Sequence, residues 1–136
     1  MTEYVLDASA LIRYLDNEPG ATRVGEIMAA CATGQAEVCI SAVQWGEVAG
    51  NLRKRFGAST EATVLVNLLP SKATIVPVTG DRAVRAAALK VDRRLAYADG
   101  FAMDLALDSA DHVLVTADYG FKAVEDLAKI EFLPTK

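Results

Sequence analysis

YVLDAS, residues 4–9, is the stretch from which the fold is best deduced. Its apolar residues have the pattern of a short buried strand, and that strand ends on the carboxylate of Asp7. Ser9 follows two positions later, where it is expected to cap a helix that runs through Leu15. Aspartate commonly terminates strands, so this stretch alone predicts only a strand-to-helix turn.

A similar stretch, HVLVTAD at residues 112–118, occurs near the other end of the chain. It places Thr116 and Asp118 directly after a second apolar run. In open parallel sheets, ligands bind outside the carboxyl ends of the strands. Asp7 and Asp118 are therefore expected at one edge of a shared sheet.

Short apolar runs alternate with segments of helical period along the whole chain, which predicts crossover connections and an α/β fold with a mainly parallel central sheet flanked by helices. The predicted strands are residues 4–6, 38–40, 75–78, 113–115 and 130–133. Besides the helix after Ser9, a helix is predicted between Gly20 and Gly34. Another is predicted over 45–56, where Ser41 and Gln44 form a capping box at its start. Three more are predicted from 59 or 60 to about 70, from 79 or 81 to about 94, and over 98–109.

Length and composition favour one globular domain over residues 1–136, because hydrophobic residues make up 52% of the chain and charged residues 24%. No apolar run approaches the ~20 residues of a membrane span, so we expect a cytoplasmic protein without a membrane segment. The net charge of −4 argues against a broad basic surface for nucleic acid. Any nucleic-acid binding must use a local basic patch.

Helical periodicity gives the remaining acidic residues different environments. Asp99 falls in or beside the apolar arc of its helix, whereas Asp104 and Asp108 fall on the opposite side and are expected to be solvated. A buried Asp99 needs a metal or hydrogen bonds to compensate its charge, although a helix-capping role stays open. Glu47 lies early in the helix after the second strand, but opposite that helix's apolar stripe, so periodicity alone predicts an exposed side chain.

Clustered carboxylates are unfavourable unless a cation lies between them. The chain has one histidine, His112, placed at the start of its strand and therefore expected to be structural. Cys31 and Cys39 lie in apolar segments and are expected to be buried thiols. The candidate ligands are thus hard oxygens, which suit Mg²⁺ or Mn²⁺ rather than Zn²⁺. No Gly-rich phosphate loop is present.

In this order, the motifs resemble the PIN domain, and within it the VapC-type toxins of toxin–antitoxin systems. They are D-x-S at Asp7 and Ser9, Glu47 in its helix, Asp99 within LAYADGFAMDLA, and T-x-D-x-x-F at Thr116, Asp118 and Phe121. The resemblance covers essentially the whole chain. It implies a PIN-like three-layer α/β/α sandwich and a Mg²⁺-dependent endoribonuclease, with Mn²⁺ as a possible substitute. Asp7, Glu47, Asp99 and Asp118 would then be the catalytic metal ligands, with Ser9 and Thr116 supporting them.

The same resemblance implies the toxin component of a type II system that inhibits translation and growth, a cognate VapB-type antitoxin and a homodimer. Trp45, Phe56 and the stretch VLVNLL at 64–69 are candidate interface residues, although each could equally belong to the core. For the RNA substrate, Arg82, Arg85 and Arg93 share one helix face, which could instead be an ordinary solvated face.

Two other functions stay open at this stage. A PIN-domain nuclease in RNA maturation or quality control would share every motif named above. A non-catalytic Mg²⁺-binding signalling module would also gather acidic residues, but a phospho-accepting site needs paired acids after its first strand. A haloacid-dehalogenase-type phosphatase likewise expects a second aspartate where this chain has Ser9.

Overall fold

The computed structural model describes residues 1–136 and contains a single sheet of five parallel strands. The strand order is β3-β2-β1-β4-β5. The strands are β1 (Glu3–Leu6), β2 (Glu37–Ser41), β3 (Thr74–Val76), β4 (His112–Thr116) and β5 (Lys129–Phe132). All five predicted strands are confirmed.

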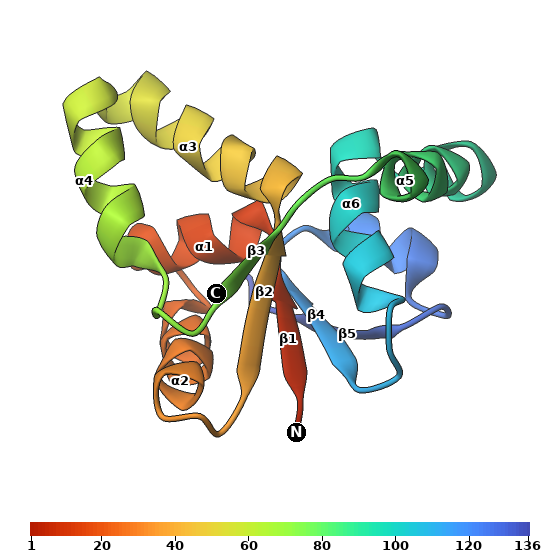
Figure 1. The fold of residues 1–136 in the computed structure, drawn as a ribbon, viewed down its shortest axis with the longest axis horizontal. Helices are drawn as coiled ribbons and strands as arrows, with labels where there is room; N and C mark the ends of the chain where they lie inside the picture. The colour runs from red at the N-terminus through yellow and green to blue at the C-terminus, as the bar shows by residue number, and fades with distance from the viewer.

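Helices cover both faces of this sheet, as Figure 1 shows, so the predicted three-layer α/β/α architecture is confirmed. They are α1 (Ala8–Leu15), α2 (Ala21–Ala32), α3 (Ala42–Phe56), α4 (Ala58–Leu68), α5 (Gly80–Arg93) and α6 (Tyr97–Ala106). A short 3₁₀ helix, η1 (Tyr119–Val124), follows β4 and was not predicted. None of the helices is long and apolar enough to span a membrane.

The alternation of side chains along β1 divides the core into two clusters. Leu6 points to the face covered by α1–α4, where it packs with Leu11 and Ile40. Val5 points to the other face, where it packs with Leu114 and with the side chains of α6 and η1. The central strands are therefore buried on both sides, which explains their continuous apolar runs.

The hydrogen bonds at the starts of α1 and α3 differ in part from the prediction. Asp7, not Ser9, caps α1: its Oδ1 accepts a hydrogen bond from the Ala10 N–H at 2.9 Å. Ser41 caps α3 as predicted, by accepting from the Val43 N–H. The expected capping box is wrong, however, because the Gln44 side chain turns away from the start of its own helix to contact other elements.

Asp104 is also placed differently from the prediction of a solvated residue. Its side chain is 2% exposed and accepts from Arg82 Nη1 at 2.8 Å and from Arg85 Nε. Arg82 bonds Asp108 as well, at 2.8 Å. The helical pattern excluded Asp104 from the apolar arc correctly, but α5 packs against that side of α6 and brings its arginines there.

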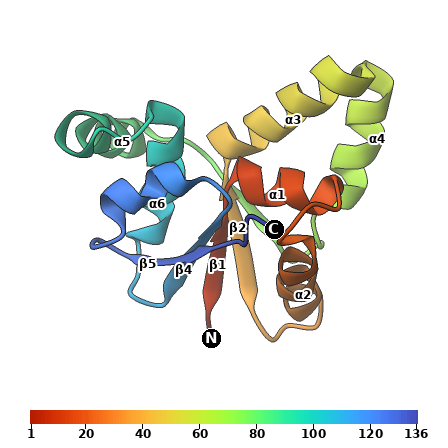
Figure 2. The same ribbon diagram turned by 180° about the vertical axis from the view of Figure 1, so that it is seen from behind.

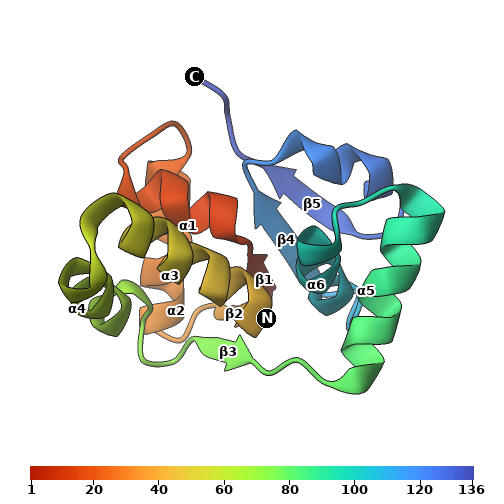
Figure 3. The same ribbon diagram turned by 90° about the horizontal axis from the view of Figure 1, so that it is seen from above.

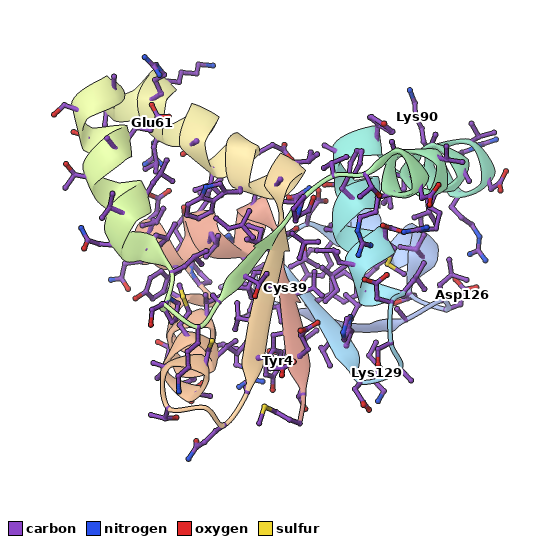
Figure 4. All side chains as sticks on the ribbon, in the orientation of Figure 1. Tyr4, Cys39, Glu61, Lys90, Asp126 and Lys129 are labelled. Atoms are coloured by element: carbon purple, nitrogen blue, oxygen red, sulfur yellow. The ribbon has the colours of Figure 1, made fainter.

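His112 and the cysteines have structural roles, as predicted. His112 Nδ1 lies 2.7 Å from the Leu105 carbonyl oxygen, and its Nε2 lies 2.6 Å from Glu3. Both cysteines are buried free thiols. Burial, and then Glu3, raises the pKa of Cys39 to about 12, so this thiol stays protonated. Figure 4 shows Cys39 within the central sheet layer.

The C-terminal segment crosses the joint between α1 and α2, as seen from behind in Figure 2. Arg13 donates to the carbonyls of Pro19 and Pro134, which links this joint to the chain end. Gly20 has a left-handed φ of 99°, and a Cβ there would lie 2.9 Å from the Cβ of Leu133. Glycine is therefore required at this position by both conformation and space.

We expect Arg82→Met to lower the free energy of unfolding by about 2 kcal/mol, because it leaves the buried Asp104 carboxylate with Arg85 as its remaining cation. Urea denaturation followed by circular dichroism measures this change. The matched control is Arg53→Met, which removes an exposed ion pair to Glu61 and should cost less than about 0.5 kcal/mol. Equal losses in the two variants would contradict the special role of the Asp104 cluster.

Candidate active site at the carboxyl edge of the sheet

Asp7 lies at the carboxyl end of β1 and is almost fully buried. Both of its oxygens accept hydrogen bonds. Besides the Ala10 N–H, Ser9 Oγ donates to the carboxylate at 2.8 Å and Thr116 Oγ1 donates at 2.6 Å. These bonds fix the carboxylate in one orientation.

Burial raises the pKa of Asp7 to about 6, although the hydrogen bonds from Thr116, Ala10 and Ser9 act in the opposite direction. The nearby negative charge of Asp118 raises it further. Loss of water around the carboxylate therefore outweighs three favourable hydrogen bonds. A positive charge close to Asp7 would restore the ionised form.

Ser9 and Thr116 join the ends of the two central strands. Ser9 Oγ accepts from the Ala117 N–H at 2.9 Å, and Thr116 Oγ1 accepts from the Asp118 N–H at 2.9 Å. The Asp118 side chain in turn accepts from the Gly120 N–H and so starts η1. These contacts place Asp7 and Asp118 on neighbouring strand ends, as the two similar stretches predicted.

Asp99 comes to this edge from the other side of the sheet, in the first turn of α6. Figure 3 looks down onto the edge, with α1 and α3 on one side of the strands and α6 on the other. The side chain is half-buried, and burial raises its pKa to about 7. Asp118, Asp7 and Glu47 raise it further by their negative charges, and Asp118 also by sharing a hydrogen bond. It does not cap the helix, since the cap position is Ala96.

Glu47 is exposed on α3, on the side away from its buried residues Val48 and Leu52. Periodicity predicted this exposure. The side chain is nevertheless close enough to the acidic edge for the negative charge of Asp118, after partial loss of solvent, to raise the pKa of Glu47. An exposed position on α3 and a position at the site are therefore compatible.

The side chain of Gln44 is a part of the site that sequence reasoning missed. It is buried and bonds the backbone beside Asp7 and the backbone beside Asp99. The signal was available, because Gln44 is the polar member of the buried stripe that continues through Val48 and Leu52. It was interpreted as a local cap instead.

The carboxylates of Asp7, Glu47, Asp99 and Asp118 have no cationic side chain beside them. No arginine, lysine or histidine side chain forms an ion pair with any of them. Carboxylate oxygens with uncompensated charge form a donor set that suits a hard divalent cation. In the structure, no three or more of these carboxylates are arranged as the ligands of a metal ion.

The three arginines predicted to bind RNA are each paired with carboxylates other than the four at this edge. Arg82 bonds Asp104 and Asp108, Arg85 bonds Asp104, and Arg93 bonds Asp126 at 2.8 Å. Figure 4 shows Asp126 at the far side of the molecule, near Lys129. The positive charges of the three arginines are therefore largely compensated by carboxylates of the same chain.

Comparison with protein families gives a match to the PIN domain over residues 4–127. No curated protein matches the sequence. Three solved structures show the same fold. A chain of the VapBC2 complex from Rickettsia felis, bound to a DNA fragment of its promoter, has a TM-score of 0.73 at 14% identity, with 98% of this chain and 100% of that chain covered.

The second structure is a toxin–antitoxin complex from Klebsiella pneumoniae, with a TM-score of 0.64 at 20% identity over 89% of this chain and 92% of that chain. The third is VapC20 from Mycobacterium tuberculosis, a toxin that cleaves the sarcin–ricin loop, with a TM-score of 0.63 at 19% identity over 88% and 93%. At these identities the likeness shows the fold.

The raised carboxyl pKa values predict how the stability of the metal-free protein depends on pH. Between the ordinary aspartate pKa of 3.8 and the folded-state value of about 7, Asp99 holds its proton in the folded protein and releases it on unfolding. This contribution to stability is therefore present below about pH 4 and is lost as the pH rises through about 7. Asp7 acts in the same direction, up to about pH 6.

We expect Asp99→Asn to be more stable than the wild type at pH 8 in EDTA, by about 1 kcal/mol given the partial exposure of the side chain, and to lose this advantage at pH 4. Urea denaturation at both pH values measures the difference. Asp111→Asn, an exposed aspartate just before β4, is the matched control and should leave stability unchanged at both. A destabilised Asp99→Asn at pH 8 would show that the Asp99 carboxylate is compensated within the protein.

Proposed function

The chain belongs to the PIN-domain family, and on this basis we propose that it is a metal-dependent endoribonuclease that hydrolyses RNA phosphodiester bonds. The observation that carries the proposal is the group of four carboxylates at the carboxyl edge of the sheet, with no side-chain cation to balance them. None of them lines one of the surface pockets of the protein. An open edge suits a polymer better than an enclosed small molecule.

We propose that Asp7, Glu47, Asp99 and Asp118 hold the metal, with Mg²⁺ as the cofactor and Mn²⁺ as a substitute. A bound divalent ion would lower the pKa of a water and stabilise negative charge on the phosphate during its hydrolysis. The role of Ser9 and Thr116 is to hold Asp7, since both oxygens of this carboxylate are already oriented by their hydroxyl groups. Glu47, which is exposed, can move toward a cation with little cost in packing.

We further propose that the protein is the toxin of a type II toxin–antitoxin system and inhibits translation and growth in the cytoplasm by cutting RNA. The support is the shared fold with the K. pneumoniae complex and with VapC20. A cognate VapB-type antitoxin could inhibit it through a basic side chain, because an acidic edge without internal cations attracts a positive partner. A nuclease of RNA maturation or quality control would use the same site.

The geometry of Asp7 argues against the phospho-accepting alternatives. Its carboxylate is 1% exposed and both oxygens accept hydrogen bonds from neighbouring groups. A nucleophile must present a free oxygen lone pair to the phosphorus atom. This carboxylate is better suited to a fixed ligand.

We propose that RNA is contacted first beside Asp118, at Tyr119 and Lys122. Tyr119 is exposed and stacks on Phe132, with ring centroids 5.1 Å apart, and the Lys122 ammonium lies over both rings. Lys122 forms no ion pair, so it can neutralise a phosphate while the ring stacks on a base. Arg82, Arg85 and Arg93 would have to exchange their carboxylate partners to bind RNA, which makes them secondary candidates.

Homodimerisation is proposed through the outer face of α5. Val84 and Val91 are 70% and 77% exposed, and the exposed Ala87 and Ala88 lie between them. Only Ala86 of α5 is buried, so this apolar stripe is not covered within the chain. Two such stripes could pack closely, because alanine lets helix backbones approach.

The nuclease proposal predicts that RNA cleavage requires Mg²⁺ or Mn²⁺ and is abolished by EDTA. Asp99→Asn and Glu47→Gln should each lower the cleavage rate by at least about 100-fold, because each removes a proposed ligand. Cleavage of single-stranded and structured RNAs by antitoxin-free protein is followed on denaturing gels. Asp111→Asn serves as the control. Full activity in EDTA, or in both variants, would contradict the acidic site.

The dimer proposal predicts that the wild type elutes as a dimer in size-exclusion chromatography with light scattering, and that Val84→Lys and Val91→Lys convert it to a monomer. The control is Val66→Lys, because Val66 is 81% exposed on α4, within the other candidate interface at 64–69. A dimer that dissociates in the α4 variant alone would place the interface on α4 instead.

A further inference from the structure

Gln44 connects three elements that carry acidic residues of the site. Its side chain is 1% exposed. Its Oε1 accepts from the Ala8 N–H at 2.7 Å, and its Nε2 donates to the Ala98 carbonyl oxygen at 2.7 Å. Both bonds are short. The bond to Ala8 is buried and the bond to Ala98 is partly buried, and in such surroundings unpaired polar groups are costly.

Each backbone group at the ends of this bridge is adjacent to a carboxylate of the site. Ala8 follows Asp7 and begins α1, where the first N–H groups lack partners within the helix. Ala98 precedes Asp99 in the first turn of α6. The side chain itself extends from α3, one turn before Glu47.

The chemistry of the bridge requires a glutamine. One end must accept from an N–H and the other must donate to a C=O, and a neutral carboxamide does both at once. Glutamate would place an acceptor against the Ala98 carbonyl, and an apolar side chain would leave the Ala8 N–H without a partner. Hydrogen bonds of this kind define a distance, whereas apolar packing between α3 and α6 would allow sliding.

We propose that Gln44 is a positioning residue that sets the separation between the Asp7 segment and the Asp99 segment across the sheet edge, and thereby the affinity of the site for its metal. The metal part of this inference rests on the proposed function. Asp7 is held on the β4 side by Thr116, and Gln44 supplies the corresponding connection on the α6 side. The two carboxylates reach the edge from opposite faces of the sheet. Packing of Val5 against the side chains of α6 holds that helix on β1, and Gln44 adds a directional contact directly beside both carboxylates.

The test compares Gln44→Met, which keeps the length of the side chain but removes both hydrogen bonds, with Leu52→Ala. Leu52 lies two turns further along the buried stripe of α3, so its truncation destabilises the same helix without touching the bridge. Gln35→Met, an exposed glutamine, controls for the substitution itself. Urea denaturation first establishes that each variant is folded under the conditions used.

The main readout is the Mn²⁺ dissociation constant, measured by calorimetry. We expect it to rise about tenfold in Gln44→Met, as for loss of a group that orients metal ligands, and to stay within about twofold in Leu52→Ala. At saturating Mn²⁺ we also expect a lower kcat with an unchanged KM for RNA, because the altered spacing of the carboxylates persists after the metal is bound. Equal weakening in both variants, or an unchanged constant in Gln44→Met, would overturn the inference, because a purely structural role predicts those results.

A second readout uses metal-free protein and separates this inference from the proposed function. In Gln44→Met, amide exchange at Ala8 should accelerate and the carboxyl ¹³C signals of both Asp7 and Asp99 should shift. If the wild type bound no Mn²⁺, the nuclease proposal would fail. The ¹³C signals would then still test whether Gln44 positions the two segments, and unshifted signals would overturn that role. If Gln44→Met did not fold, Gln44→Glu would replace it, with Ala8 still protected but the Asp99 signal shifted.

Discussion

The buried carboxylate of Asp7 is the constraint on which the rest of this structure depends. It starts α1, and it accepts hydrogen bonds from a hydroxyl on that helix and from one on the neighbouring strand. A charged group in this position is costly, and burial raises its pKa to about 6 despite hydrogen bonds from three donors. The strand ends of β1 and β4 must therefore stay in register around it, which brings Asp118 to the same edge.

The distribution of charge follows from that constraint. Arginines on α5 neutralise Asp104, Asp108 and Asp126, and other arginines bond Asp16 and Glu131. The acids at the carboxyl edge have no such partners, and burial raises the pKa values of Asp7, Glu47 and Asp99. Fold stability is thus lowered locally at the edge where chemistry is proposed, which is typical of functional sites. The proposed metal ion, or a basic partner, would compensate this charge from outside the chain.

Most of the fold could be predicted, because strand and helix periods are local properties. The apolar runs at 4–6, 38–40 and 113–115 became the three central strands, and Gly20 and Gly34 bracket α2. The errors involved polar side chains with a choice of partners. Ser9, Gln44 and Asp104 each have a sensible local role, but a residue distant in the sequence offers a better contact in the folded chain.

The sequence by itself determined the parallel α/β fold and the acids that end its strands, because both follow from spacing along the chain. Tertiary structure decided which of the charged residues stand together. Helical periodicity describes only one helix at a time, so it could not show that α5 would neutralise Asp104 or that Glu47 would face the edge from an exposed position. Gln44 bonds Ala8, 36 positions earlier in the chain, and Ala98, 54 positions later, and so connects the Asp7 segment to the Asp99 segment. Only the packing of α3 between these two segments makes this connection possible.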